Sequence, residues 1–479
     1  MRLIPLHDFD EANRAEAAKN MSEFKFYLAP LTGSPFWRNE NLKMPLKENP
    51  NLSLYPHLER PPLYFWLMIV STKIFGNNEF AYRLPSFIFG LLTISYFLIF
   101  SLPYSAIAIL TSSDLWLSSQ SALMDTTLTF FLFLAFLFLL KSLENKNGKY
   151  SFLSGIFWGL AILSKGQPAV IFAFPLLYLL LTKRISLKNL IQITAAAFLT
   201  VLPWLYLTIN KFGFNNFVEG FLNFAKARAV IEDTTQKAPF FWYLRWWFES
   251  ARIALILFSS LLIYDLLNKK VDQERKIILA YFIPSFLLFS LARNKVWWYV
   301  LPLIPIIVYY IDLSAKQFLK KNKNKALNLS LITFISSLPV FYNQRNILAL
   351  ILFGLYVLIS YLILTLEINL NKTLNKLLTF SLLILPLIIF LFKFPKVNPT
   401  YPEVKKIGEY YKKLPQPKCL YIKNMPYESA LFYTDAKEVN YLDPKTSLPK
   451  NCQNYLLTPD QERYQLIFEY KRLKLYKLN

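Results

Sequence analysis

Charged side chains that could do chemistry stand out at four places beside the apolar segments of this 479-residue sequence. The acids that could do chemistry are Asp10 and Glu11 in "DFDEANRA", Glu59 in "HLERPP" and Asp125 in "SALMDTTLT". The basic residues of this kind are Arg60, Lys165, Arg293 and Lys295. Ionisable groups near a membrane are costly, so each is a candidate functional residue. A carboxylate can accept a proton from a hydroxyl, and Arg or Lys can bind a leaving phosphate. Together they predict chemistry on a lipid-linked phosphate.

Each of these groups also has a purely structural interpretation. The acids near residue 10 could complement the dipole at the start of a helix, with Asp8 as its N-cap. Asp125 could cap the apolar segment that follows it. The Glu59–Arg60 pair and the basic residues could extend to lipid headgroups. Neither interpretation is excluded by any one residue alone.

The elements that must position these residues are membrane spans. Hydrophobic residues make up 54% of the chain, aromatic residues 17%, and only 11 residues are Gly. This composition is typical of an all-α polytopic membrane protein. The net charge of +23 does not favour nucleic-acid binding, because cytoplasmic loops of membrane proteins carry Lys and Arg. Apolar runs predict about twelve spans, near residues 84–101, 104–118, 125–141, 151–164, 168–182, 190–209, 252–267, 277–292, 297–312, 327–341, 347–366 and 377–394.

The distribution of Lys and Arg predicts which side each connector occupies. Basic residues concentrate in alternate connectors, which the positive-inside rule places in the cytoplasm: 141–150, 183–189, 267–276, 313–326 and 367–376. The other connectors, including 210–251 and everything after 395, are then outside. An ambiguous apolar run at 61–75 begins with Pro61 and Pro62, a pair that suits a helix start. We interpret it as a half-embedded interfacial helix, which keeps all the candidate site residues on the outer face.

Three domains follow from this topology: a first outer loop with interfacial helices (1–83), a transmembrane domain (84–394) and a small outer α/β domain (395–479). In the last, "PEVKKIGEYYKKL" predicts an amphipathic helix. The segments "CLYIKN", "NYLLTP" and "RLKLYKL" predict strands. Its Cys419 and Cys452 could form a disulfide in an exported domain or remain as buried free thiols.

Seven stretches in order carry a family resemblance: "DFDEANRAEAAKNM…LAPLTG", "ERPPLYFWL", "EFAYRLPSFIFGLLTI", "SALMDTTLTFFLFL", "GLAILSKGQPAV", "KAPFFWYL" and "NKVWWYVLPLIP". Over roughly residues 8–312 the chain resembles the bacterial aminoarabinose transferase and protein O-mannosyltransferase-like branch of the GT-C glycosyltransferases. In that family a transmembrane helix precedes the Asp-Glu loop, which would bring the spans to thirteen. Here only "MRLIPLH" stands before that loop.

The resemblance implies roles for the candidate residues. Asp10 matches the catalytic base, with Glu11 and Asp125 as further catalytic carboxylates. The residues implied to hold the donor phosphate are Arg60 (a Lys in the family's Glu-Lys-Pro-Pro motif), Lys165, Arg293, Lys295 and Tyr299. Glu59 would orient neighbours or bind an optional divalent cation. A histidine-dependent zinc site is disfavoured, because Gln236 stands where a His is common. Asn13 and Arg14 replace the Arg and Tyr of many members.

The implied activity is an inverting transfer of a sugar from a polyprenyl (undecaprenyl) phosphate to a lipid A-type glycolipid or another envelope acceptor. The expected location is the outer, periplasmic face of the inner membrane. Expected partners are the lipid-linked donor, the acceptor and membrane lipids, with no nucleic acid, and we expect a monomer. A protein acceptor is one alternative, and a non-enzymatic flippase or transporter is another. Against transport, no paired halves with interrupted helices are visible. Against an oligosaccharyltransferase, neither "RWWFES" nor "VWWYVL" contains a Trp-Trp-Asp motif.

Overall fold

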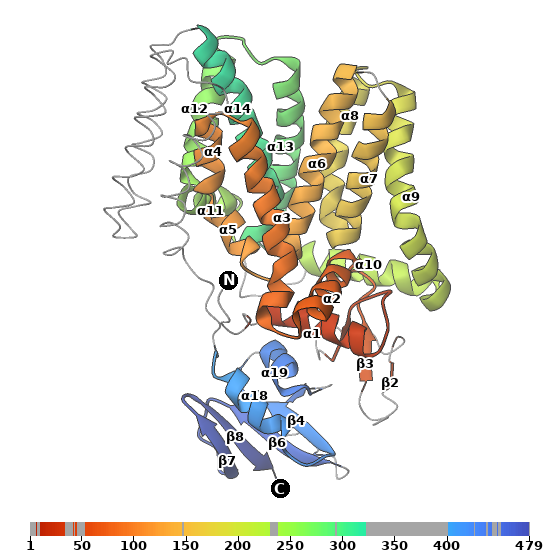
Figure 1. The fold of residues 1–479 in the computed structure, drawn as a ribbon, viewed down its shortest axis with the longest axis vertical. Helices are drawn as coiled ribbons and strands as arrows, with labels where there is room; N and C mark the ends of the chain where they lie inside the picture. Colours follow the sequence, from red (N-terminus) through yellow and green to blue (C-terminus); the bar gives the residue numbers. More distant parts are fainter. Residues whose placement is uncertain are drawn as a thin grey trace, which may run out of the picture.

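The structure, a computed structural model, shows a helical bundle with a small sheet-containing unit at one end (Figure 1). It describes residues 6, 10–33, 42, 44–45, 53–145, 148–229, 238–292, 295–321, 401–425, 427–436, 439–442, 448 and 452–478. The three spans expected within 327–394 lie outside the described residues, as does the domain boundary expected at 395.

Apolar helices build the bundle in the order of the predicted spans. They are α3 (Glu79–Phe100), α4 (Pro103–Leu110), α5 (Ser113–Ser119), α6 (Met124–Asn145), α7 (Gly148–Lys165), η2 (Gln167–Phe172), α8 (Ala173–Leu181), α9 (Leu187–Phe212), α12 (Arg252–Leu267), α13 (Gln273–Leu291), η3 (Trp297–Leu303) and α14 (Ile304–Lys321). Within the described part, four continuous helices are long and apolar enough to span a membrane: 79–100, 124–144, 187–212 and 297–318. A fifth span is formed if α11 (Trp242–Ser250) and α12, bent by 112°, count as one. The chain is therefore a multi-pass membrane protein.

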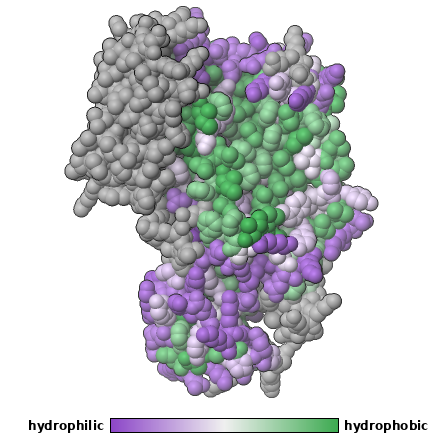
Figure 2. All heavy atoms as spheres, in the orientation of Figure 1, coloured by the Kyte–Doolittle hydropathy of each residue, from purple (hydrophilic) through white to green (hydrophobic). Residues whose placement is uncertain are grey.

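The surface of the bundle is what a lipid environment requires. On the face shown in Figure 2, a broad apolar band covers the middle of the bundle, and hydrophilic residues lie above and below it. Helix α9 illustrates the band, because its Phe198, Leu199 and Leu207 are each at least half exposed. A contiguous apolar surface of this kind marks contact with a membrane or partner rather than with water.

Two glycines allow close packing inside the bundle. Gly155 and Gly159 lie one turn apart on α7 and face α9. A Cβ atom at Gly155 would lie 2.3 Å from the carbonyl oxygen of Ile193, and one at Gly159 would lie 2.8 Å from that of Ala197. Small residues at this spacing let two membrane helices approach to backbone contact.

Shorter elements cover one end of the bundle. They are α1 (Asp10–Glu23), α2 (Leu63–Phe75), α10 (Phe214–Ala229), α11, and a small sheet in the order β1 (Leu31–Thr32), β3 (Ser53–Pro56) and β2 (Met44–Pro45). At about 1.5 Å per residue, the 13 residues of α2 reach roughly 20 Å, short of the roughly 30 Å hydrocarbon core. Helix α2 is therefore too short to span the membrane as one straight helix.

The C-terminal unit combines α18 (Val404–Lys412), α19 (Tyr427–Thr434) and a five-stranded sheet. The strand order is β5 (Val439–Tyr441), β4 (Lys418–Ile422), β6 (Gln453–Thr458), β8 (Leu473–Leu478) and β7 (Gln465–Tyr470). The helix predicted in "PEVKKIGEYYKKL" is α18, and the three predicted strands are β4, β6 and β8. Helix α19 and strands β5 and β7 were not predicted.

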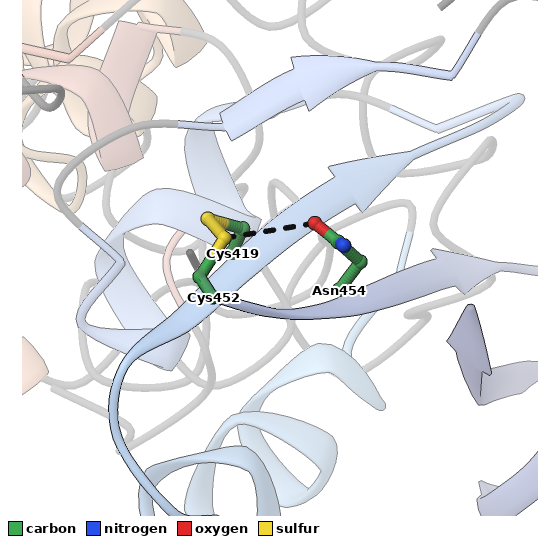
Figure 3. Close-up of a disulfide and its surroundings, with 3 residues drawn as sticks. All are labelled: Cys419, Cys452 and Asn454. Carbon is green, nitrogen blue, oxygen red and sulfur yellow. Dashed lines mark hydrogen bonds between the residues drawn. A yellow bond between two sulfur atoms is a disulfide. The ribbon is translucent and has the colours of Figure 1, made fainter. Parts of the chain in front are cut away.

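A disulfide joins two neighbouring strands of this unit. Cys419 on β4 and Cys452, just before β6, are bonded, with Cα atoms 5.8 Å apart (Figure 3). Of the two alternatives left open by the sequence, the structure shows the disulfide. Strands β4 and β6 pair in parallel with Cys419 opposite Asn454, so the bond fastens the start of this pair.

Candidate active site

Glu11 connects the first helix to the bundle. Its carboxylate accepts hydrogen bonds from Arg83 Nε at 2.7 Å and Arg83 Nη2 at 2.8 Å, and from the backbone N–H of Ala122 at 2.7 Å. Glu11 and Arg83 are both buried. Two parallel charge-assisted bonds to one guanidinium fix both position and orientation. Of the predicted catalytic carboxylates, Glu11 is thus the one held between α3 and the start of α6, where it positions α1.

Asp10 and Arg14 form an ion pair one turn apart at the start of α1. Arg14 Nη2 lies 3.2 Å from Asp10 Oδ1, and the Asp10 side chain remains 29% exposed while that of Arg14 is 4% exposed. The Asp10 carboxylate is therefore partly accessible from outside the protein, which any side chain that accepts a proton from a substrate requires. Arg14 is different, because its Nε and Nη1 atoms are buried without a hydrogen-bond partner.

Asp125 and Lys165 form a second, buried ion pair. Asp125 lies in the first turn of α6 and Lys165 is the last residue of α7. Lys165 Nζ donates to Asp125 Oδ1. The same ammonium lies 4.9 Å from the centroid of the Tyr299 ring on η3, and Asp125 Oδ2 is buried without a hydrogen-bond partner. The structure therefore brings three predicted site residues from separate elements into direct contact.

Gly166 shapes the end of α7 so that Lys165 can take this position. Its φ of +76° lies in the left-handed region, which favours glycine. An added Cβ atom would also lie 3.2 Å from Pro61 Cδ. The Ser164-Lys165-Gly166 stretch is thus packed directly against the loop that carries Glu59 and Arg60.

Tyr64 on α2 lies among the charged residues. Its hydroxyl is 2.7 Å from Ser86 Oγ, which donates to the carbonyl oxygen of Leu123 at 2.8 Å. Burial raises the pKa of the Tyr64 phenol, and the charges of Arg14, Glu11 and Asp125 act on it. The phenol therefore stays protonated and links α2 to the Asp125 end of α6.

Glu59 and Arg60 connect the loop before α2 to α1. Glu59 Oε1 lies 3.0 Å from His57 Nδ1 and 3.7 Å from Arg60 Nε, and Arg60 Nη1 donates to Asn13 Oδ1 at 3.1 Å. Burial alone would raise the pKa of the Glu59 carboxyl, but His57 and Arg60 outweigh it and hold that pKa below its usual range. Glu59 is therefore an ionised carboxylate that orients two neighbours.

The predicted cation at Glu59 finds no ligand set in the described residues. No group of three or more His, Cys, Asp or Glu side chains within that part of the chain is arranged to hold a metal. The one oxygen of Glu59 that contacts partners already faces a histidine nitrogen and a guanidinium. A metal usually needs a fuller set of oxygen or nitrogen ligands, so these residues do not fit one. Gln236 lies outside the described residues.

The remaining predicted phosphate ligands lie on the connector before η3. Lys295 Nζ donates to the carbonyl oxygens of Ala238 at 3.0 Å and Ala292 at 2.6 Å. Burial lowers the pKa of this ammonium. Lys295 thus braces the connector in this structure rather than joining the Asp125–Lys165 pair. Arg293 lies outside the described residues.

Arg14 and Tyr64 are the residues that the predicted site omits. The sequence places Arg14 four residues after Asp10, a spacing that puts both side chains on one helix face. That spacing could have marked Arg14 as a neighbour of the base. Nothing local marked Tyr64, because its place depends on how α2 packs against α3 and α1.

Comparisons with known proteins agree with this architecture. A family model described as dolichyl-phosphate-mannose-protein mannosyltransferase matches residues 59–207. The undecaprenyl phosphate-alpha-4-amino-4-deoxy-L-arabinose arabinosyl transferase of Wigglesworthia glossinidia brevipalpis is 25% identical over 342 residues, 64% of this chain and 59% of that protein. The corresponding transferase 2 of Proteus mirabilis (strain HI4320) is 23% identical over 405 residues, 71% of this chain and 70% of that protein.

The fold itself matches solved structures along almost its whole length. The crystal structure of ArnT from Cupriavidus metallidurans bound to undecaprenyl phosphate has a TM-score of 0.70 with this chain. The match covers 99% of this chain and 94% of that one at 16% identity. In sequence, the matches span only 59% to 62% of the length of the first three curated relatives.

The apolar helices and the match to the solved ArnT structures define an integral-membrane protein with the ArnT fold. More specifically, the chain is similar in sequence to undecaprenyl phosphate-alpha-4-amino-4-deoxy-L-arabinose arabinosyl transferases and, over residues 59–207, to the dolichyl-phosphate-mannose-protein mannosyltransferase family model. The resemblance inferred from the seven sequence stretches is therefore confirmed.

Proposed function

We propose that this protein transfers a sugar from a polyprenyl phosphate to an acceptor hydroxyl in the cell envelope. The observation that carries the proposal is the cluster at one end of an apolar bundle. There the exposed carboxylate of Asp10 lies on the same helix start as Arg14, whose charge acts on the buried Asp125–Lys165 pair. The cluster offers a proton acceptor and several cations where a lipid-linked phosphate would enter. Relatives named as undecaprenyl phosphate-dependent arabinosyl transferases support the class of donor.

The proposed reaction is a single displacement at the anomeric carbon of the sugar. The acceptor oxygen forms the new bond to that carbon while its proton passes to a carboxylate oxygen of Asp10. The bond from the anomeric carbon to the phosphate oxygen breaks, and both bonding electrons leave with the polyprenyl phosphate. Attack from the face opposite the leaving group inverts the configuration.

Developing charge on the leaving phosphate requires preorganised cations. Lys165 is held by Asp125 and by the face of Tyr299, so its position is fixed before substrate binds. Arg60 is held by Asn13 and Glu59, close to α1. Arg293 and Lys295 complete the proposed phosphate-binding set from the connector before η3, with Lys295 exchanging its carbonyl contacts for the phosphate.

The proposal includes a topology. We infer that the charged cluster faces the outer, periplasmic side of the inner membrane, since the Lys- and Arg-rich connectors lie at the opposite ends of the spans. About twelve spans, the three domains at 1–83, 84–394 and 395–479, and a monomeric protein belong to the same proposal. The disulfide in the C-terminal unit supports an oxidising compartment for it.

The acceptor is the least constrained part of the proposal. A lipid A-type glycolipid is the first candidate, because the relatives from Wigglesworthia glossinidia brevipalpis and Proteus mirabilis are named as 4-amino-4-deoxy-L-arabinose arabinosyl transferases. A protein hydroxyl is the second, because the family model matched at residues 59–207 describes a protein mannosyltransferase. Mass spectrometry of envelope lipids and glycoproteins from a deletion strain distinguishes the two.

The test of the base is Asp10→Asn in a purified transfer assay with a lipid-linked sugar donor. We expect loss of at least about 100-fold in turnover, because general-base catalysis contributes roughly 10²- to 10⁴-fold. Membrane insertion should stay unchanged, since Asp10 is partly exposed and an amide oxygen at this position can still accept a hydrogen bond from Arg14. Asp460→Asn in the C-terminal unit is the matched control and should retain activity. Full activity of Asp10→Asn would refute the assignment of the base.

A further inference from the structure

We propose that Arg14 is an additional phosphate-binding residue of this site, one that contacts the donor phosphate while it holds Asp10. This inference deepens the proposed transferase function and rests on it. The residue lies one turn after the start of α1, and no predicted phosphate ligand occupies that helix. The ligand class is a phosphate monoester or diester oxygen, attached to lipid or free.

The Arg14 guanidinium is buried, and only part of it has a hydrogen-bonding partner. Its side chain is 4% exposed, and only Nη2 has a charged partner, Asp10 at 3.2 Å. Both Nε and Nη1 are buried without a hydrogen-bond partner. A buried donor left unpaired costs about 1–3 kcal/mol, and more when it is charged. Native proteins rarely keep such a group unless a ligand or water completes it.

The other cations considered for this site already have hydrogen-bond or ion-pair partners. Arg83 gives two of its N–H groups to Glu11, and Lys165 is paired with Asp125. Lys295 donates to two backbone carbonyl oxygens. Among these four cations of the described region, Arg14 is the one with buried N–H groups left over. An anion entering the cluster could therefore accept hydrogen bonds from Nε and Nη1 of Arg14.

The position of Arg14 relative to the other charged residues of the cluster also favours phosphate binding. The charge of Arg14 acts on Tyr64, Asp125 and Lys165, which places the guanidinium within electrostatic reach of all three. A guanidinium stays charged at any working pH and carries donors on more than one edge. Arg14 can therefore keep Nη2 on Asp10 and offer its other edges to a phosphate. Phosphate binding and placement of the base would then depend on one side chain.

The test measures binding, not turnover. The full chain in detergent micelles is titrated with undecaprenyl phosphate and, separately, with undecaprenol, which lacks the phosphate. The variants are Arg14→Gln, Arg14→Lys and the control Arg245→Gln. The Arg245→Gln substitution also removes one positive charge. The Arg245 side chain, however, is 85% exposed on α11, away from any proposed contact.

We expect Arg14→Gln to weaken undecaprenyl phosphate binding by about tenfold or more, the equivalent of a lost hydrogen bond to a charged group. Arg14→Lys should weaken it less, because the charge remains while the planar fork is lost. Arg245→Gln should bind as the unchanged protein does, and undecaprenol should bind all four proteins alike. Inorganic phosphate, added as competitor, should displace the lipid from the unchanged protein if the headgroup alone is recognised.

Three results would overturn the inference. One is normal undecaprenyl phosphate binding by Arg14→Gln. Another is equal loss of undecaprenol and undecaprenyl phosphate binding, which would indicate a structural role. The third is a lack of phosphate-dependent binding by the unchanged protein. If binding depends on Arg14 but no sugar is transferred, the transferase proposal fails and the phosphate site stands. If transfer depends on Asp10 but Arg14→Gln binds undecaprenyl phosphate normally, the transferase proposal stands and the phosphate-binding role of Arg14 fails.

Discussion

Lys165→Met should destabilise the bundle strongly, because it leaves a buried carboxylate without its partner. The side chains of Asp125 and Lys165 are 1% and 11% exposed, and Asp125 Oδ2 already lacks a hydrogen-bond partner. Removing one member of a buried ion pair costs about 3–5 kcal/mol. Met keeps most of the aliphatic chain that packs beside Tyr299, so the loss reports on charge more than on volume.

The pair can be separated from its surroundings by a double-mutant cycle. Asp125→Asn should also destabilise, because it leaves the Lys165 ammonium buried with only the Tyr299 ring, whose cation–π attraction is worth roughly 0.5–2 kcal/mol. The double variant Asp125→Asn/Lys165→Met carries no buried charge at these positions. It should recover at least about 2 kcal/mol relative to the sum of the single losses.

The assay is equilibrium unfolding in mixed micelles, followed by tryptophan fluorescence. A loss of 3–5 kcal/mol shifts the unfolding equilibrium by roughly 10²- to 10³-fold or more. The exposed pair Arg245–Glu249, at 3.8 Å and 85% and 60% exposed, is the control, and Glu249→Gln should cost less than about 1 kcal/mol. Losses below about 1 kcal/mol for Lys165→Met, or strictly additive single losses, would refute the reasoning.

Two further predictions concern Glu59 and the disulfide. The lowered pKa of Glu59 means that its ionised form stabilises the folded protein above its ordinary pKa of 4.5. This contribution is lost as the pH falls from that value through the lower folded pKa. Acid unfolding curves of Glu59→Gln and the unchanged protein should therefore converge there, and a constant gap would contradict the pairing with His57. Reducing the Cys419–Cys452 bond, whose partners are 33 residues apart, should cost about 3–4 kcal/mol by chain entropy. Unaltered unfolding of the C-terminal unit under reductant would contradict this.

The sequence predicted the membrane helices where apolar runs are long. Helices α3, α6 and α9 fall on the runs 84–101, 125–141 and 190–209 and extend beyond them, because polar and aromatic residues at their ends continue the helix. The run 104–118 is different, since it divides into α4 and α5. There Ser and Thr side chains at 111–113 turn to backbone carbonyls, including those of Ala108 and Ser250. Such local hydrogen bonds compete with a continuous helix.

The composition of the site was predictable, but its pairing was not. The alternation of basic connectors predicts Asp10, Asp125 and Lys165 at one side of the membrane without any knowledge of contacts. Which cation faces which acid depends on helix packing. Lys165 meets Asp125 across 40 residues and Arg83 meets Glu11 across 72, separations that no local pattern encodes. Glu11 therefore appeared beside Asp10 as a second candidate acid, whereas the structure gives it a positioning contact.

Helix α1 is shared by the bundle and the C-terminal unit, and this arrangement bears on Asp10 and Arg14. On the bundle side, Glu11 is fixed by Arg83. On the other side, Lys19 pairs with Asp435 of the C-terminal unit, just after α19. Glu79, at the start of α3, accepts from that unit as well, through Lys405 at 2.7 Å and Tyr433 at 3.2 Å. Because α1 is held at its first turn by one body and at its third by the other, the direction of the Asp10–Arg14 pair depends on both contacts. A sheet unit whose described residues lie outside the charged cluster can thus still help to orient it.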